Sequence, residues 1–295
     1  MGPLGALALP MTTLSLLQIL ILGLVQGAAE LLPVSSSAHV IVAEKLMGLD
    51  PSSPEMTFLL VMLHTGTMFA VIAFFWKSWR EQYLSSRGVL LDTLKHVFIA
   101  TLATGVLGFG LKILIEKFFL HGGDIELLFA KLPVMVASLV IAGLLILVSA
   151  RKAGKEAPDA AISPRIAGIV GLAQGICLPF RGLSRSGTTI STGLLLGVGK
   201  RRIELFSFAL AVVLTPPVIG RSLLRLIRIH PEIKQPSHLI AQLKPGLAGA
   251  AFSFLSGLFA LWLLSRVLES GRWQIFGYYC LAFALFVAGL ALAGY

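Results

Sequence analysis

The chain has 295 residues, of which 56% are hydrophobic and 13% are charged. This composition exceeds what a soluble core needs, so it excludes an ordinary soluble enzyme and predicts a protein with several membrane spans. The formal net charge is +10, but the basic residues stand at the ends of apolar stretches rather than in an aromatic-interleaved patch. That distribution argues against a nucleic-acid partner and favours anionic membrane lipids.

The first element in chain order is an apolar helix pattern that breaks into a turn rich in hydroxyl groups. The helix is expected over about residues 12–29 and the turn at 31–36, after which a second helix carries His39 away. Pro33 argues against one continuous helix. Irregular polar backbone survives at membrane depth only where protein lines a cavity, so we expect a re-entrant helical hairpin. Lys45 is the first basic residue, so this end lacks the basic start of a secretory signal and is expected to stay in the mature fold.

Six further stretches of about 20 apolar residues are each long enough to cross a bilayer core of roughly 30 Å. Three follow the first hairpin, and three follow a second interrupted segment. The predicted spans lie near residues 57–76, 94–115, 131–150, 204–222, 245–265 and 273–293.

The second interrupted segment follows the third span and has the same plan as the first. A helix at 165–178 is expected to lead to a turn at 179–186, and a helix at 187–199 returns. Pro179 and Gly182 interrupt the helical pattern. We therefore expect a second re-entrant hairpin.

The spacing of matching residues indicates a repeat. Gln26 and Gln174 are 148 residues apart, and Ser35 and Ser184 are 149 apart. Three spans, an odd number, separate the two hairpins, so the second must enter from the opposite face. The predicted fold is an all-α integral membrane protein with an inverted-topology repeat, six transmembrane helices and two re-entrant hairpins that meet near the midplane. The halves cover about residues 11–150 and 160–293 of a single domain, 1–295.

The basic residues predict the orientation, because cytoplasmic loops carry an excess of Lys and Arg. The face on which the first hairpin opens carries nine: Lys45, Lys112, Lys117, Lys131, Arg221, Arg225, Arg228, Lys234 and Lys244. The opposite face carries thirteen: Lys77, Arg80, Arg87, Lys95, Arg151, Lys152, Lys155, Arg165, Lys200, Arg201, Arg202, Arg266 and Arg272. We place the second face in the cytoplasm, which puts both termini outside.

Three polar residues of the first hairpin carry candidate chemistry, namely Glu30, Ser36 and His39. An ionisable group inside a membrane costs roughly 2.5–3.5 kcal/mol on insertion scales, so Glu30 and His39 need a partner or a function. Ser36 and His39 are three residues apart and share a helical face, which suits a nucleophile or a proton relay. The structural alternatives are an ion pair of Glu30 with Arg185 or Lys45, and a buried, hydrogen-bonded His39.

In the second turn, hydroxyl groups surround Arg185 just before a helix begins, and Gly182 and Gly187 let the backbone approach a ligand closely. Free amides at a helix N-terminus, hydroxyls and a guanidinium form an anion site suited to phosphate. Two such turns facing one ligand at the midplane would suit a diphosphate. The alternative for any single hydroxyl is a helix N-cap. The hydroxyl-bearing residues are Ser184, Ser186, Thr188 and Thr189.

Other polar residues have less specific interpretations. Gln26 is taken as a supporting residue of the first turn, and Gln174 as an interhelical hydrogen-bond partner. His64 lies within a predicted span, where it either lines the cavity or is simply buried. Cys177 and Cys280 fit neither a metal nor a disulfide spacing, so we interpret them as buried small hydrophobic residues.

Three motifs stand out in the interrupted segments: Gln26-x-x-x-Glu30, Pro33-Val34-Ser35-Ser36-Ser37-Ala38-His39 and Gly182-Leu183-Ser184-Arg185-Ser186-Gly187-Thr188-Thr189. Together they resemble the undecaprenyl pyrophosphate phosphatase family of bacteria, and the likeness covers nearly the whole chain. The resemblance implies an enzyme of the bacterial inner membrane that hydrolyses undecaprenyl diphosphate to undecaprenyl phosphate and inorganic phosphate. This reaction recycles the lipid carrier for peptidoglycan and other envelope polymers. The resemblance also implies an outward-facing active site and bacitracin resistance on overproduction.

The resemblance further implies roles by motif position. The catalytic residues would be Glu30, Ser36, His39 and Arg185. The phosphate-binding residues would be Ser35, Ser37, Ser184, Ser186, Gly187, Thr188 and Thr189. The chain departs from the family pattern at Gln26, where the family often has Glu, and at Phe180-Arg181, which separate Pro179 from Gly182.

Our hypothesis is that Arg185 and the helix amides hold the diphosphate while Ser36 attacks, assisted by His39, and that water then clears a phosphoserine. Two alternatives remain, with His39 as the nucleophile or as the general base for direct attack by water. Glu30 would orient His39 or hold a divalent cation, Mg²⁺ or Ca²⁺, that bridges the phosphates. A secondary transporter or lipid flippase for a phosphate-bearing substrate is the alternative of another class. The sequence leaves the oligomeric state open, a dimer included.

Overall fold

The computed structural model describes residues 14–50, 54–121, 131–153, 160–180, 182–229 and 236–294. Its named elements are all α-helices, which confirms the predicted fold class. In chain order they are α1 Leu16–Leu31, α2 Ser36–Leu46, α3 Pro54–Gln82, α4 Arg87–Phe118, α6 Leu132–Ala153, α7 Pro164–Cys177, α8 Arg185–Leu195, α9 Lys200–Ile229, α10 Pro236–Glu269 and α11 Gln274–Leu292.

Among the described residues, six helices are long and apolar enough to cross a membrane, as the sequence predicted: α3, α4, α6, α9, α10 and α11. The helices run past the predicted apolar stretches because polar end residues continue the same helix; α4, for example, has 32 residues. Large apolar side chains face outward, and Phe98, Val106 and Phe109 of α4 are each at least 64% exposed. Such a surface is suited to lipid rather than water, so the chain is a multi-pass membrane protein.

The four remaining helices are too short to span a bilayer. α1 has 16 residues, α7 has 14, and α2 and α8 have 11 each. At a rise of 1.5 Å per residue they reach about 16–24 Å, less than the roughly 30 Å of a hydrocarbon core. α1 and α2 are joined by residues 32–35, and α7 and α8 by residues 178–184. The helices therefore break where the sequence predicted breaks.

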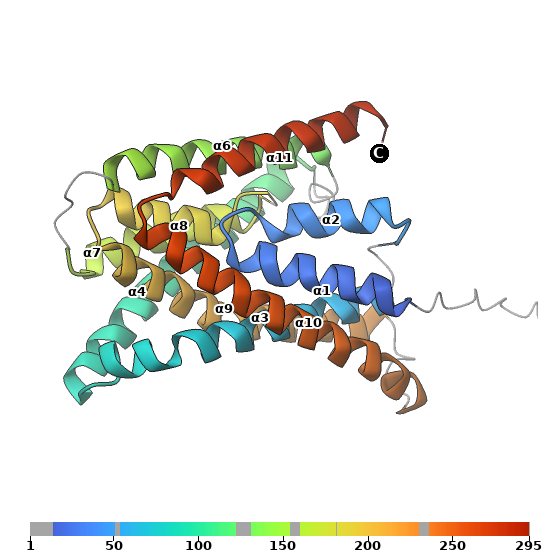
Figure 1. Cartoon of the computed structure of the whole chain (residues 1–295), viewed down its shortest axis with the longest axis horizontal. Helices are drawn as coiled ribbons and strands as arrows, with labels where there is room; N and C mark the ends of the chain where they lie inside the picture. Colours follow the sequence, from blue (N-terminus) through green and yellow to red (C-terminus); the bar gives the residue numbers. More distant parts are fainter. Residues whose placement is uncertain are drawn as a thin grey trace, which may run out of the picture.

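The two short-helix pairs lie toward opposite ends of the molecule in Figure 1, with α1 and α2 in blue and α7 and α8 in yellow shades. Their re-entrant character and their relation by an inverted repeat, with halves at 11–150 and 160–293, stay predictions. Residues 12–13 of the first expected helix and Arg181 of the second turn lie outside the described residues.

Glycines in α1 and α7 allow each of these helices to pack closely against a long neighbour. α1 lies against α10, and α7 lies against α4. A Cβ on Gly27 would lie 2.4 Å from the carbonyl oxygen of Ser253, and a Cβ on Gly171 would lie 2.2 Å from that of Ala100. Any larger side chain would push the helices apart, so these glycines permit the close helix packing that membrane interfaces favour.

Hydroxyl and amide groups add hydrogen bonds between the same helices. Gln174 Nε2 donates to Thr104 Oγ1 at 3.0 Å, and Thr104 Oγ1 donates to the carbonyl of Gly171 at 2.8 Å. This confirms that Gln174 is an interhelical hydrogen-bond partner. On the other side, Ser256 Oγ in α10 donates to the carbonyl of Leu24 in α1 at 2.8 Å. Both helices that carry the interrupted segments are therefore fastened to a long neighbour.

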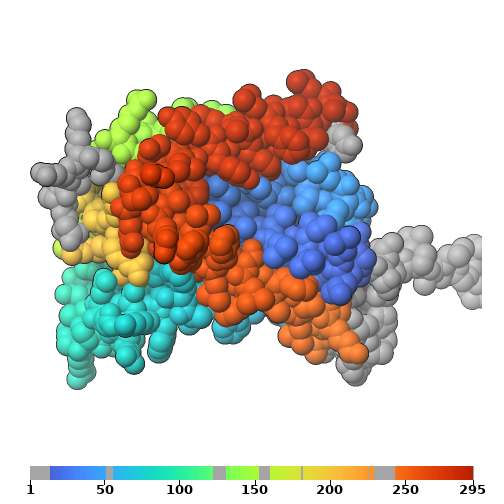
Figure 2. Space-filling model, in the orientation of Figure 1, coloured from blue at the N-terminus to red at the C-terminus, as the bar shows by residue number. Residues whose placement is uncertain are grey.

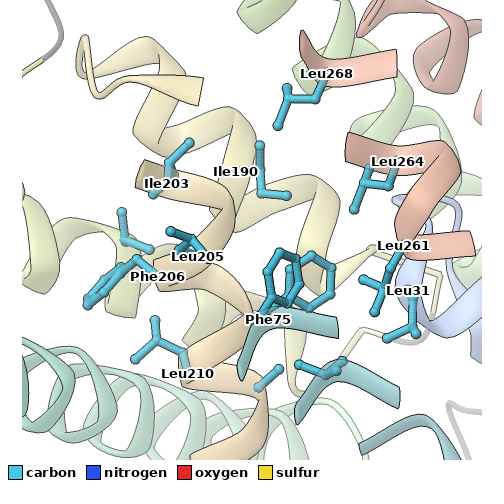
Figure 3. Close-up of a cluster of buried hydrophobic side chains, with 14 of the residues drawn as sticks. Leu31, Phe75, Ile190, Ile203, Leu205, Phe206, Leu210, Leu261, Leu264 and Leu268 are labelled. Carbon is cyan, nitrogen blue, oxygen red and sulfur yellow. The ribbon is translucent and has the colours of Figure 1, made fainter. Parts of the chain in front are cut away.

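The largest cluster of buried apolar side chains joins both interrupted segments to the long helices. It includes Leu31 at the end of α1 and Ile190 in α8. Figure 3 shows Phe75 of α3 between leucines of α9 and α10, with Leu31 close by, and its ring stacks on Phe208 with centroids 5.1 Å apart. The turns are thus attached to a tightly packed apolar base, which limits their movement.

The first hairpin lies between α10 and α11 on the face drawn in Figure 2, where it appears in blue between orange and red. A second apolar cluster joins α2 to α6 and α11 through Ala38, Met135 and Ala284. Cys280 of α11 also donates from Sγ to the carbonyl of Pro33 at 3.4 Å. The last helix therefore contacts the first turn directly.

Candidate active site

The two turns touch each other. Ser186 at the start of α8 donates from Oγ to the carbonyl of Leu32 in the first turn at 3.4 Å. A Cβ on Gly187 would lie 3.2 Å from Cβ of Pro33. Packing of the two hairpins thus brings together residues that are more than 150 positions apart in sequence.

Glu30 lies at the centre of the contact. Its Oε1 accepts a hydrogen bond from Arg185 Nη2 at 2.8 Å, within an ion pair. Its Oε2 accepts from Ser36 Oγ at 2.5 Å and from Gln26 Nε2 at 3.3 Å. His64 Nε2 lies 3.9 Å from the same Oε2. Three polar residues singled out in the sequence, Arg185, Ser36 and Gln26, therefore converge with His64 on the Glu30 carboxylate.

Burial strengthens the attraction within the ion pair of Glu30 and Arg185. The side chain of Glu30 is 16% exposed and that of Arg185 is 25% exposed, so water screens their attraction only in part. Between the two partners that the sequence suggested for Glu30, the structure selects Arg185, the first residue of α8. The pairing leaves Arg185 anchored beside the first turn, where its remaining N–H groups can bind an anion.

His64 reaches the site from α3, so the structure decides between its two interpretations in favour of lining the site. Its Nδ1 donates to the carbonyl of Leu60 at 2.8 Å, because a carbonyl oxygen can only accept. In a neutral ring the other nitrogen, Nε2, then carries the lone pair and faces Glu30. The signal in the sequence was a single histidine inside an apolar span, which does not reveal where its ring points.

The N-terminus of α2 has an unusual start. The N-cap, Ser35, has φ 72° and ψ 94° and makes no side-chain cap hydrogen bond. The left-handed region is unfavourable for serine, and such strain concentrates at functional sites. Its Oγ lies 3.5 Å from that of Ser37. The first-turn amides of α2 are thus not capped by Ser35, which suits binding of an anionic group.

The N-terminus of α8 is capped. Ser184 Oγ accepts from the amide of Gly187 at 3.2 Å and lies 3.4 Å from Ser186 Oγ, so the N-cap interpretation holds for Ser184. Thr189 Oγ1 donates to the carbonyl of Arg185 at 2.9 Å and lies 2.6 Å from Ser207 Oγ. Both hydroxyls help to position Arg185, and a direct phosphate contact for them stays a prediction.

Other residues of the second turn are tightly enclosed. Thr188 is buried next to the site. Gly182 has φ 111°, and a Cβ there would lie 2.8 Å from the carbonyl oxygen of Met135 in α6. Only glycine tolerates both conditions, so this residue determines the path of the turn.

His39 points to α11 instead of to Ser36. Its Nδ1 donates to the carbonyl of Ser35 at 2.8 Å, and its Nε2 lies 2.8 Å from the hydroxyl oxygen of Tyr279. The imidazole also stacks on Phe283 with centroids 3.8 Å apart. The step of three residues along α2 therefore does not bring the imidazole to the Ser36 hydroxyl, because both ring nitrogens bind elsewhere. Sequence reasoning missed Tyr279, whose only signal was a polar tip inside an apolar helix.

The cysteines stand apart from this chemistry. Both are free thiols; Cys280 is fully buried and Cys177 is half-buried in α7. The sequence-based interpretation of both as buried small hydrophobic residues fits Cys280 better than Cys177, because only Cys280 is fully buried.

A metal site made of protein ligands alone is not present in the described part of the chain, which contains no close group of three His, Cys, Asp or Glu side chains. Glu30 supplies a carboxylate, and Gln26 adds an amide beside it. Mg²⁺ is often bound by one or two carboxylates together with substrate phosphates. The residues present fit that shared mode of binding.

The fold and the paired turns define a class of protein, a polytopic membrane protein whose polar centre is suited to an anion carried by a lipid. The sequence model of one protein family, described as Bacitracin resistance protein BacA, matches residues 19–286. The chain belongs to this family.

Individual relatives are similar over almost their whole length. Undecaprenyl-diphosphatase 2 of Acinetobacter baylyi is 52% identical over 283 residues, which cover 94% of this chain and 99% of that protein. The undecaprenyl-diphosphatase of Bdellovibrio bacteriovorus is 31% identical, with 96% of this chain and 98% of that protein covered. That of Korarchaeum cryptofilum is 34% identical, with coverages of 92% and 98%.

Proposed function

We infer that the chain is an undecaprenyl-diphosphatase, an enzyme that hydrolyses undecaprenyl diphosphate to undecaprenyl phosphate and inorganic phosphate. The observation that carries this function is the convergence of Ser36 and Arg185 on Glu30 inside an apolar, lipid-facing protein. The reaction returns the lipid carrier to the synthesis of peptidoglycan and envelope polymers, and its link to bacitracin resistance follows from the family.

The first chemical step is attack on the terminal phosphorus by the hydroxyl oxygen of Ser36. Ser36 Oγ already donates to Glu30 Oε2, so the carboxylate is placed to accept the proton as the new P–O bond forms. The bond from phosphorus to the bridging oxygen breaks, and undecaprenyl phosphate leaves. Arg185 and the uncapped amides of α2 stabilise the charge on the equatorial oxygens.

The second step is attack of water on the phosphoserine: the bond from phosphorus to Ser36 Oγ breaks, Glu30 returns its proton to Oγ, and inorganic phosphate leaves. His64 Nε2, facing Glu30, supports a role as the base that takes a proton from this water. His39 is less suited to be the nucleophile, because both of its ring nitrogens are already hydrogen-bonded.

A divalent cation, Mg²⁺ or Ca²⁺, is part of the proposal. Glu30 and the side-chain oxygen of Gln26 would hold it together with the diphosphate oxygens, and it would neutralise charge on the two phosphates. Arg185, which pairs with Glu30 Oε1, would bind the terminal phosphate through its remaining N–H groups.

For the cellular location we propose the bacterial inner membrane, with the site opening to the periplasmic side. The nine-to-thirteen distribution of basic residues between the two faces supports this orientation. The substrate's two phosphates would reach the turns from that side while its polyprenyl tail stays in the lipid.

The test is release of inorganic phosphate from undecaprenyl diphosphate by the purified protein in detergent. We expect release by the wild type and its loss in Arg185→Ala and Glu30→Ala. Lys112→Ala is a matched control, because Lys112 forms a separate i,i+4 pair with Glu116 in α4. Binding of the substrate without any phosphate release by the wild type would instead indicate a transporter or flippase.

A further inference from the structure

The imidazole of His39 is held from three sides. Its Nδ1 donates to the carbonyl of Ser35, its Nε2 accepts from the hydroxyl of Tyr279, and its face stacks on Phe283 with an interplanar angle of 7°. The hydroxyl can donate to Nε2 only while the proton of the neutral ring is on Nδ1. The Ser35 carbonyl, which can only accept, requires the proton on Nδ1, and the Tyr279 hydroxyl stabilises this same tautomer by donating to Nε2.

The carbonyl that His39 binds belongs to the strained residue of the first turn. Ser35 has φ 72°, and its carbonyl oxygen accepts both from the His39 backbone amide at 3.4 Å and from Nδ1. A strained conformation persists only where the surroundings over-determine it. The ring of His39, one turn further along α2, restrains the backbone of Ser35 in this way through its hydrogen bond to the Ser35 carbonyl.

The residue that this restraint positions is Ser36. It follows Ser35 directly, begins α2, and donates from Oγ to Glu30. A change of Ser35 to the common right-handed or extended region would rotate the peptide between the two serines. The hydroxyl of Ser36 and the first amides of α2 would then turn away from Glu30.

We propose that His39 is a positioning residue that acts through Nδ1 on the carbonyl of Ser35, and that Tyr279 of α11 is a second positioning residue that fixes the His39 tautomer. The proposal rests on the proposed phosphatase function for its kinetic consequences. It assigns to α11 a part in the reaction, although neither Tyr279 nor Phe283 belongs to any of the three motifs.

Two substitutions of His39 separate positioning from acid–base chemistry. The amide nitrogen of asparagine can take the place of Nδ1, and that of glutamine can take the place of Nε2. Positioning predicts that His39→Asn keeps phosphate release within about tenfold of wild type, since one hydrogen bond to Ser35 is replaced by another. It predicts that His39→Gln loses about 10²-fold or more in kcat, with KM little changed.

Substitution of Tyr279 tests whether its hydroxyl fixes the tautomer of His39. Tyr279→Phe keeps the ring stack and removes the donor, so kcat should fall about three- to tenfold, the effect of one neutral hydrogen bond. Tyr278→Phe is the matched control, because Tyr278 is the neighbouring residue on α11 and is exposed. In the His39→Asn background, Tyr279→Phe should have no further effect on kcat.

Nitrogen-15 NMR of labelled histidine in the full-length protein reports the tautomer directly. We expect a neutral His39 protonated on Nδ1 in the wild type and an increased share of the Nε2-protonated form in Tyr279→Phe. An unchanged tautomer in that variant, or equal loss of activity in His39→Asn and His39→Gln, would overturn the proposal. Absence of phosphate release by the wild type would refute the phosphatase function alone, because the tautomer measurement does not depend on turnover.

Discussion

Glu30 and Arg185 are 155 residues apart in sequence, and Arg185 Nη2 donates to Glu30 Oε1 at 2.8 Å. This bond joins the end of α1 to the start of α8, so it fastens the two interrupted segments to each other. It also places a guanidinium next to the carboxylate that binds Ser36. One interaction therefore assembles the site and supplies its positive charge.

Replacing Arg185 by lysine should be far from conservative. The ammonium keeps the charge but loses the planar fork that binds Glu30 and a phosphate together. We expect kcat for phosphate release to fall about 10²–10³-fold, as after loss of a preorganised charge-stabilising donor. Arg201→Lys is the control, because Arg201 pairs with Glu204 away from the site; its kcat should stay unchanged. Equal losses in the two variants would contradict a specific role for Arg185.

Covalent labelling tests the nucleophile. With substrate labelled in the terminal phosphate, rapidly quenched wild-type protein should carry label, and Ser36→Ala should carry none, because Ser36 is the hydroxyl hydrogen-bonded to Glu30. Ser37→Ala should still be labelled, because the Ser37 hydroxyl lies near Ser35 instead. Recovery of phosphohistidine in place of phosphoserine would refute the serine mechanism.

His64 should act after the first step. His64→Gln removes the lone pair at Nε2, so removal of phosphate from Ser36 by water should slow about 10²-fold and phosphoserine should accumulate. Quenched-flow kinetics would separate a fast first turnover from a slow steady state. If both phases slow together, His64 acts on the first step or on binding instead.

The close packing of α1 against α10 should depend on glycine. In Gly27→Ala the new methyl group would lie 2.4 Å from a backbone carbonyl, so we expect a loss of about 1–3 kcal/mol in the free energy of unfolding. Gly105→Ala in α4 is the control, because a Cβ there meets nothing within 4 Å; it should be neutral or stabilising by up to about 1 kcal/mol. Thermal unfolding of both variants in one detergent measures the difference. A similar loss in both variants would show that the close packing at Gly27 is not the cause.

Removal of divalent cations tests the proposed shared metal. Treatment with a chelator should lower phosphate release, and added Mg²⁺ or Ca²⁺ should restore it, because the cation would neutralise the diphosphate. Gln26→Leu should raise the cation concentration needed for this restoration, since it removes the side-chain oxygen ligand. Full activity in the presence of chelator would remove the metal from the mechanism.

Much of the site was readable from the sequence, with clear exceptions. The concentration of Glu30, Ser36 and Arg185 in two helix breaks predicted their meeting, because ionisable groups are rare inside apolar segments. The same reasoning expected the His39 ring to act on Ser36, but in the structure the ring nitrogens bind Ser35 and Tyr279. Two residues on a shared helical face need not bind each other. Tyr279 could not be predicted at all, as nothing in its surroundings distinguishes it from other aromatic residues of a membrane helix.

The sequence by itself determined the six spans and the positions of the two breaks. These depend on local properties, namely runs of apolar residues and the helix-breaking effect of Pro and Gly, so each stretch carries its own information. Tertiary structure alone decided that Glu30 binds Arg185 rather than Lys45, that His64 faces the site, and that α11 reaches His39. The physical reason is that these contacts depend on how closely distant helices pack. That distance is determined jointly by residues such as Gly27 and Gly171, which lack a side chain, and by the helices they face.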